Sequence, residues 1–180
     1  MLDDKKVKEA KANIKNYFFE KLITKGGFNQ IIFDTYMRNH QEYLSLAEHV
    51  HHNNFSNLWT IVISYYSMFY IANAVIYKLG YKIGSNIAHK ITADALIEFV
   101  RNKLKASLIE DYEKAKDEAL EIAGTRADLM IDSFDKERVK RSAFQYETTE
   151  QIKSSKAQTS LQRAKEFSLG MYKVLNDIKR

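Results

Sequence analysis

Apolar residues recur every three or four positions along most of the chain, which is the period of amphipathic α-helices. The longest uninterrupted stripe predicts a helix over residues 55–79, with Asn54 as its N-cap. Its inward positions are Leu58, Val62, Tyr65, Phe69, Ala72, Ile76 and Leu79. The aromatic residues Trp59, Tyr66 and Tyr70 widen the stripe, so we expect this helix at the centre of the fold.

The same periodicity predicts further helices on both sides of this segment. They are expected over residues 4–23, 29–52, 87–102, 104–122 and 126–147, and from Ser155 onward, where Gln158 completes a capping box. Gly124 is expected to break the pattern between two of these helices, and no strand-length alternating segment is found. The predicted fold class is therefore all-α, an up-and-down bundle of five or more helices. Residues 1–27 are expected to form an N-terminal helical extension and residues 28–180 the bundle.

The composition supports an all-α fold and excludes several kinds of chemical site. The 180 residues include no proline and only six glycines, so few positions break a helix. Cysteine is absent, which excludes disulfides, thiolate zinc sites and cysteine nucleophiles. The charged N-terminus has no apolar leader segment, and together with the absence of cysteine this favours a cytoplasmic location. The apolar run 58–79 contains several tyrosines, serines and Lys78, so it is interpreted as a core helix with no membrane partner.

Charge and histidine placement leave few candidates for metal or cofactor chemistry. A net charge of +5 permits an anionic partner such as nucleic acid, although many helical proteins without one are this basic. Glu48 and His51 match one Glu-x-x-His element of di-iron bundles, but those bundles need a second such element. His49, His51 and His52 are interpreted as a polar helix end. No metal and no cofactor are expected, and contributions of His51, His52 or His89 to a site stay open.

The stretch KRSAFQYE, residues 140–147, is the main candidate for a functional surface. In it an arginine, Arg141, is followed five residues later by Tyr146. Arg138, Arg141 and Gln145 would share one helix face, which also describes an ordinary solvated stripe. Tyr146 would lie about 140° around an ideal helix from Arg141, as a core anchor would.

The block ISYYSMFYIANAVIYKLGYK, residues 63–82, resembles the second core helix of HEPN domains. A histidine-containing segment at residues 87–90, an arginine-bearing helix and a last amphipathic helix follow in the order that those domains have. The resemblance covers roughly residues 29–178. It implies a small all-α bundle that forms a homodimer, and a function as a metal-independent endoribonuclease, an RNA-binding module or a partner-binding module.

Active HEPN domains carry an Arg-x(4–6)-His motif, and the resemblance places its arginine on Arg141. Histidine moves protons near neutral pH, and arginine stabilises the negative charge of the transition state. The histidine position falls on Tyr146, whose side-chain type has an ordinary pKa of about 10 and is a poor base at neutral pH. The resemblance thus implies Arg141 and Tyr146 as an incomplete catalytic pair. The candidate RNA contacts around that pair are Arg138, Lys140, Ser142 and Gln145.

Three functions stay open from the sequence. The first is a HEPN-like module that binds RNA or a protein partner through this basic surface, without efficient catalysis. The second is a toxin-like, metal-independent endoribonuclease with a variant Arg/Tyr site. The third is a partner subunit of a nucleotidyltransferase, or a chain bound by an antitoxin.

Overall fold

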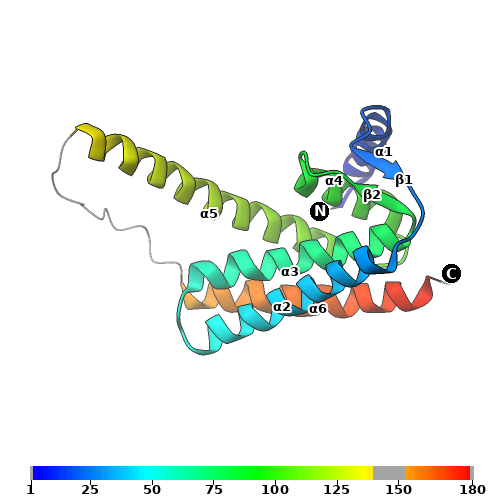
Figure 1. The fold of residues 1–180 in the computed structure, drawn as a ribbon. Coiled ribbons are helices and arrows are strands. Elements are labelled where there is room, and N and C mark those ends of the chain that lie inside the picture. The colour runs from blue at the N-terminus through cyan, green and yellow to red at the C-terminus, as the bar shows by residue number, and fades with distance from the viewer. Residues whose placement is uncertain (1, 140–152, 179–180) are drawn as a thin grey trace.

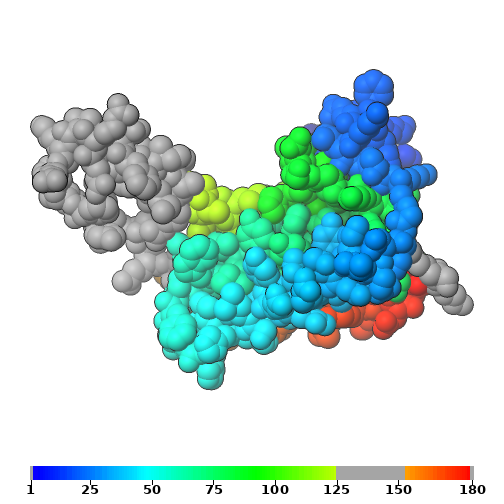
Figure 2. Space-filling view, viewed as in Figure 1, coloured from blue at the N-terminus to red at the C-terminus, as the bar shows by residue number. Residues whose placement is uncertain are grey.

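The computed structural model describes residues 2–139 and 153–178, with side chains described up to residue 124 and from residue 153 onward. It is an all-α helical bundle, which confirms the predicted fold class (Figure 1). The central helix is α3 (Asn57–Lys78), and α2 (Gln30–His52), α5 (Ala106–Val139) and α6 (Ser154–Asp177) pack against it. The space-filling view shows α2 and the α2–α3 turn covering the near face (Figure 2).

The helix α3 is central because it is apolar on nearly every side. By length and composition it could cross a membrane, but 72% of its most apolar window is buried inside the bundle. Its cap differs from the prediction, because Ser56 and not Asn54 accepts the hydrogen bond, from the Trp59 backbone N–H at 3.2 Å. Asn54 instead adopts a left-handed conformation, with φ of 52°, in the α2–α3 turn.

The helix α5 runs through Gly124 without interruption, so the predicted break there is wrong. A single glycine inside a helix costs about 1 kcal/mol relative to alanine, which a long helix tolerates. The described part of α5 extends beyond the other helices (Figure 1). Arg163 of α6 joins α6 to α5, with its guanidinium 3.5 Å from the Asp111 carboxylate and 3.4 Å from that of Glu118.

The start of α6 and a small ribbon also differ from expectation. The helix α6 begins at Ser154, and its N-cap Lys153 makes no side-chain cap bond, so the capping box is wrong. The segments β1 (Ile23–Lys25) and β2 (Tyr81–Ile83) pair antiparallel, with Ile23 opposite Ile83. Three-residue strands are too short to show an alternating pattern, which is why none was expected.

The N-terminal helix α1 (Asp4–Phe19) packs on α4 (Ala88–Ala95) and on the π-helix η1 (Leu96–Val100). The last two elements replace the single helix predicted over residues 87–102. The Asp94 carboxylate of α4 accepts hydrogen bonds from the Tyr17 hydroxyl at 2.9 Å and the Asn13 amide at 3.1 Å. Burial raises the pKa of Asp94, and it also raises the pKa of Tyr17. These bonds hold α1 against the bundle.

Candidate functional site

The residues predicted to form the basic site fall almost entirely outside the described structure. Arg138 lies in the last turn of α5, but its side chain is not among those described. The remaining candidates all lie outside the described residues; they are Lys140, Arg141, Ser142, Gln145 and Tyr146. Their roles therefore stay predictions.

The histidine cluster at the end of α2 forms no polar site of its own in the part of the chain that the structure describes. His49 packs its ring against Phe55 and places Nδ1 3.3 Å from the Asn53 amide. His49, His51 and His52 all lie in the last turn of α2, at the polar helix end that the sequence predicted. Within residues 2–124 and 153–178, no group of three or more histidine, aspartate or glutamate side chains is placed to hold a metal ion.

His40 is buried and serves packing. It lies on α2, almost inaccessible to solvent, with Nδ1 2.9 Å from the Ser67 hydroxyl of α3. The Ser67 hydroxyl also donates to the His40 carbonyl at 3.2 Å. Burial lowers the pKa of His40, so the imidazole is neutral in the folded protein at neutral pH. A side chain so enclosed has no access to a ligand.

His89 combines a ring held by contacts with α3 and access to solvent. It lies in the first turn of α4 and is half-buried against α3. Its ring centroid is 4.5 Å from that of Phe69 and 5.6 Å from that of Tyr66. Its Nδ1 is 2.7 Å from the hydroxyl oxygen of the fully buried Tyr65. One hydrogen bond and two ring contacts therefore fix the imidazole in place.

A second tyrosine hydroxyl lies behind this pair. The ring of Tyr112, on α5, is 5.8 Å from that of Tyr65 and is completely buried. The Tyr112 hydroxyl faces that of Tyr65, but it forms no well-aligned hydrogen bond to any described residue. Burial raises the pKa of both hydroxyls, so both keep their protons. The protonated hydroxyls of Tyr65 and Tyr112 thus lie one after the other on the buried side of the imidazole.

The charge around His89 is set by burial and by one lysine. Burial lowers the pKa of His89, and the positive charge of Lys116 on α5 lowers it further. The imidazole is therefore neutral at pH 7. The Lys116 ammonium is 3.3 Å from the carboxylate of its neighbour Asp117, whose side chain is 74% exposed. The site combines a neutral hydrogen-bonding ring with the charge of a lysine that is also paired with a carboxylate.

An aromatic face continues from His89 along α3 and onto α2. We define this aromatic face as Tyr43, Trp59, Tyr66, Phe69 and Tyr70. The Tyr43 ring of α2 lies 6.0 Å from Tyr66 and 5.3 Å from Tyr70. Trp59 is 57% exposed, and the others are half-buried. Flat rings at partly exposed positions provide surface on which a nucleobase can stack.

The backbone that leads into α4 is strained just before His89. Ile87, the N-cap of α4, has φ of 46° and ψ of 30°, a left-handed conformation that a β-branched side chain rarely adopts. Its side chain is exposed, so burial does not offset this cost. The outline of the molecule dips between the green segment that leads into α4 and the yellow-green α5 (Figure 2). Strain of this kind is characteristic of functional segments.

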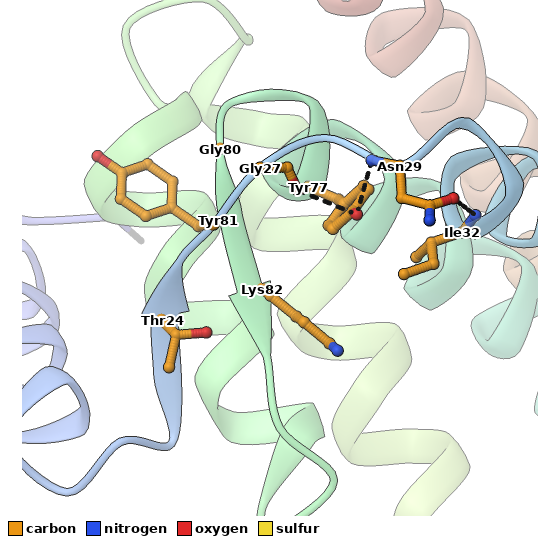
Figure 3. A pocket seen from close by; sticks show the side chains of 9 residues that line it. Thr24, Gly27, Asn29, Ile32, Tyr77, Gly80, Tyr81 and Lys82 are labelled. Carbon is orange, nitrogen blue, oxygen red and sulfur yellow. Dashed lines mark hydrogen bonds between the residues drawn. The ribbon is translucent and has the colours of Figure 1, made fainter.

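A small hollow beside the β-ribbon offers a second location, where the polar groups of Tyr77 and Asn29 are paired (Figure 3). Its volume is about 210 Å³. The Tyr77 hydroxyl accepts from the Asn29 backbone N–H at 3.0 Å and donates to the Gly27 carbonyl at 3.4 Å. The Asn29 side chain caps α2 by accepting from the Ile31 and Ile32 backbone N–H groups. The hollow is thus a seam between the ribbon and the start of α2.

Sequence reasoning left a contribution of His89 open and missed its partners. Tyr65 was assigned to the core stripe of α3, and Tyr112 lies in the helix predicted over residues 104–122, to which no function was given. These residues meet because the chain reverses after α3 and returns along α4, a path that helical periodicity does not encode. The chain matches no protein-family model, no curated protein and no solved structure.

Proposed function

We propose that this chain is an RNA-binding module of the HEPN-like type, which binds single-stranded RNA without cleaving it efficiently. The observation that carries the proposal is His89, whose ring lies on those of Phe69 and Tyr66 and whose pKa is lowered by burial and by the positive charge of Lys116. Aromatic rings stack on bases of any sequence, and lysine neutralises phosphate charge. The basic residues predicted at 138–145 stay a separate expectation of RNA contact, and most of them lie outside the described residues.

The site favours binding over catalysis because, among the described residues, it contains a single histidine. Cleavage by the 2′-hydroxyl needs both a proton acceptor and a proton donor near neutral pH. Among the described residues, no second histidine contacts His89, and His40 is enclosed by α2 and α3. The neutral imidazole of His89 is nevertheless the feature that would support the ribonuclease alternative.

The test is binding of a fluorescent single-stranded RNA oligonucleotide, measured by anisotropy at several salt concentrations. We expect the affinity to fall steeply with salt, and Lys116→Gln to make the slope shallower by about 0.7, the loss of one phosphate contact. Arg138→Gln and Arg141→Gln should each act in the same direction. Lys173→Gln is the matched control, because this exposed lysine lies on α6, away from His89.

Two further results would redirect the proposal. Cleavage of the oligonucleotide in EDTA, lost in His89→Ala and Arg141→Ala, would establish the ribonuclease alternative. Salt-independent or absent RNA binding, together with co-purification of a nucleotidyltransferase, would refute RNA binding and support the role of a partner subunit.

A further inference from the structure

The direction of the hydrogen bond between Tyr65 and His89 decides which imidazole nitrogen carries the proton. A neutral imidazole has one N–H and one acceptor nitrogen. The Tyr65 hydroxyl oxygen is 2.7 Å from Nδ1, so one of the two groups donates to the other. If Nδ1 donates, Nε2 becomes an acceptor. If Tyr65 donates, Nε2 carries the proton.

The buried hydroxyl of Tyr112 distinguishes these two arrangements. If His89 donates to Tyr65, the Tyr65 hydrogen turns to the Tyr112 oxygen, and the Tyr112 hydrogen then has no acceptor among the described residues. If Tyr65 donates to His89, the Tyr65 oxygen accepts the Tyr112 hydrogen after a small rotation. An unpaired buried donor is costly, so the second arrangement is favoured. In this arrangement the Tyr112 hydroxyl donates to the Tyr65 oxygen, and the Tyr65 hydroxyl donates to Nδ1 of His89.

We infer that Tyr65 is a positioning residue that holds the His89 proton on Nε2, so that His89 donates this N–H to a phosphate oxygen of bound RNA. The RNA ligand in this inference rests on the proposed function, whereas the position of the proton on His89 does not. Nε2 has no hydrogen-bond partner among the described residues. Phe69 and Tyr66, whose rings contact that of His89, supply stacking surface, and the positive charge of Lys116 reaches the ring and would favour a phosphate there.

The proton arrangement is tested in the protein without RNA. Nitrogen-15 NMR of histidine-labelled protein at about pH 8, above the ordinary histidine pKa of about 6.5, distinguishes an N–H nitrogen from an acceptor nitrogen. We expect His89 to carry its proton on Nε2, and Tyr65→Phe to give a mixture of both tautomers. A proton on Nδ1 in the wild type, or an unchanged tautomer in Tyr65→Phe, would overturn the inference. Far-UV circular dichroism checks that the variant folds.

The ligand is tested with the same oligonucleotide, single-stranded polyuridine RNA. Loss of one hydrogen bond weakens binding by about 10-fold, so we expect His89→Ala to lose that much and Tyr65→Phe about 5-fold. The matched control is Tyr36→Phe, whose ring packs against Tyr77 and not against His89. Unchanged affinity in both site variants of an RNA-binding wild type would overturn the ligand assignment alone. Absence of RNA binding by the wild type would overturn it together with the proposed function, while the NMR result would still decide the role of Tyr65.

Discussion

Replacing Ser160 by alanine is expected to stabilise the protein, whereas the same change at Ser168 is not. Both serines are buried on α6, two turns apart. The Ser168 hydroxyl donates to the Ala164 carbonyl at 2.6 Å. The Ser160 hydroxyl has no hydrogen-bond partner among the described residues. The two substitutions remove the same atom from the same helix, so their difference isolates the effect of the hydrogen bond.

The magnitude follows from two contributions to the free energy of unfolding. Alanine is favoured over serine inside a helix by about 0.5 kcal/mol, which applies equally at both positions. A buried hydroxyl without a partner costs about 1–3 kcal/mol, while a formed hydrogen bond contributes about 1 kcal/mol. Ser160→Ala should therefore raise the free energy of unfolding by about 2 kcal/mol, and Ser168→Ala should lower it by about 0.5 kcal/mol. For a chain of this size, the first change raises Tm by about 4–8 °C.

Urea denaturation followed by circular dichroism measures both changes at constant pH. The slope of the free energy against urea should be the same in both variants and the wild type, because the area exposed on unfolding hardly changes. If Ser160→Ala were as destabilising as Ser168→Ala, the Ser160 hydroxyl would have a partner in solution. The assignment of an unpaired hydroxyl to the buried face of α6 would then be wrong.

Three further predictions use the same denaturation assay. Gly80→Ala should lower the free energy of unfolding by about 1–2 kcal/mol, because φ is +94° at Gly80. Gly27→Ala, the control, should not lower it, and equal effects of the two substitutions would refute the role of backbone conformation. Phe167→Ala should cost about 3–5 kcal/mol, because its fully buried ring lies 5.3 Å from that of Tyr112; a cost below about 1 kcal/mol would show that the core repacks. Burial lowers the pKa of His40 below the ordinary value of about 6.5, so the unfolded chain is protonated first and stability falls as pH drops below that value until the folded pKa is reached. His40→Gln should reduce this loss between about pH 7 and pH 5, and an unchanged pH dependence would contradict it.

Helical periodicity was sufficient to predict the long helices because each one buries a stripe of apolar side chains. The central helix was expected over residues 55–79 and is observed at Asn57–Lys78. Its cap was misplaced because Asn54 and Ser56 are both good capping residues, and the turn geometry decides between them. Gly124 was expected to end a helix, yet a helix as long as α5 tolerates the cost of about 1 kcal/mol that one glycine adds.

The candidate site was only partly predictable, since its members come from three helices. His89 was among the histidines left open, but its contact with Tyr65 joins positions 24 residues apart. That contact depends on the β-ribbon and on the left-handed turn at Ile87, and neither leaves a periodic pattern. The arginine motif was found from a resemblance, and its residues beyond Arg138 lie outside the described structure.

Two features next to His89 cost folding free energy, the left-handed backbone of Ile87 and the buried tyrosine hydroxyls. The packing of the bundle requires neither. The left-handed Ile87 is exposed, so a glycine there would avoid the strain and lose little burial. Phenylalanine in place of Tyr65 or Tyr112 would fill the same volume without burying a hydroxyl. Departures of this kind from local rules are typical of functional positions, and both are explained if the chain must hold one imidazole in one orientation. The unpaired hydroxyl of Ser160 differs, because a small side chain on the buried face of α6 already has a packing explanation.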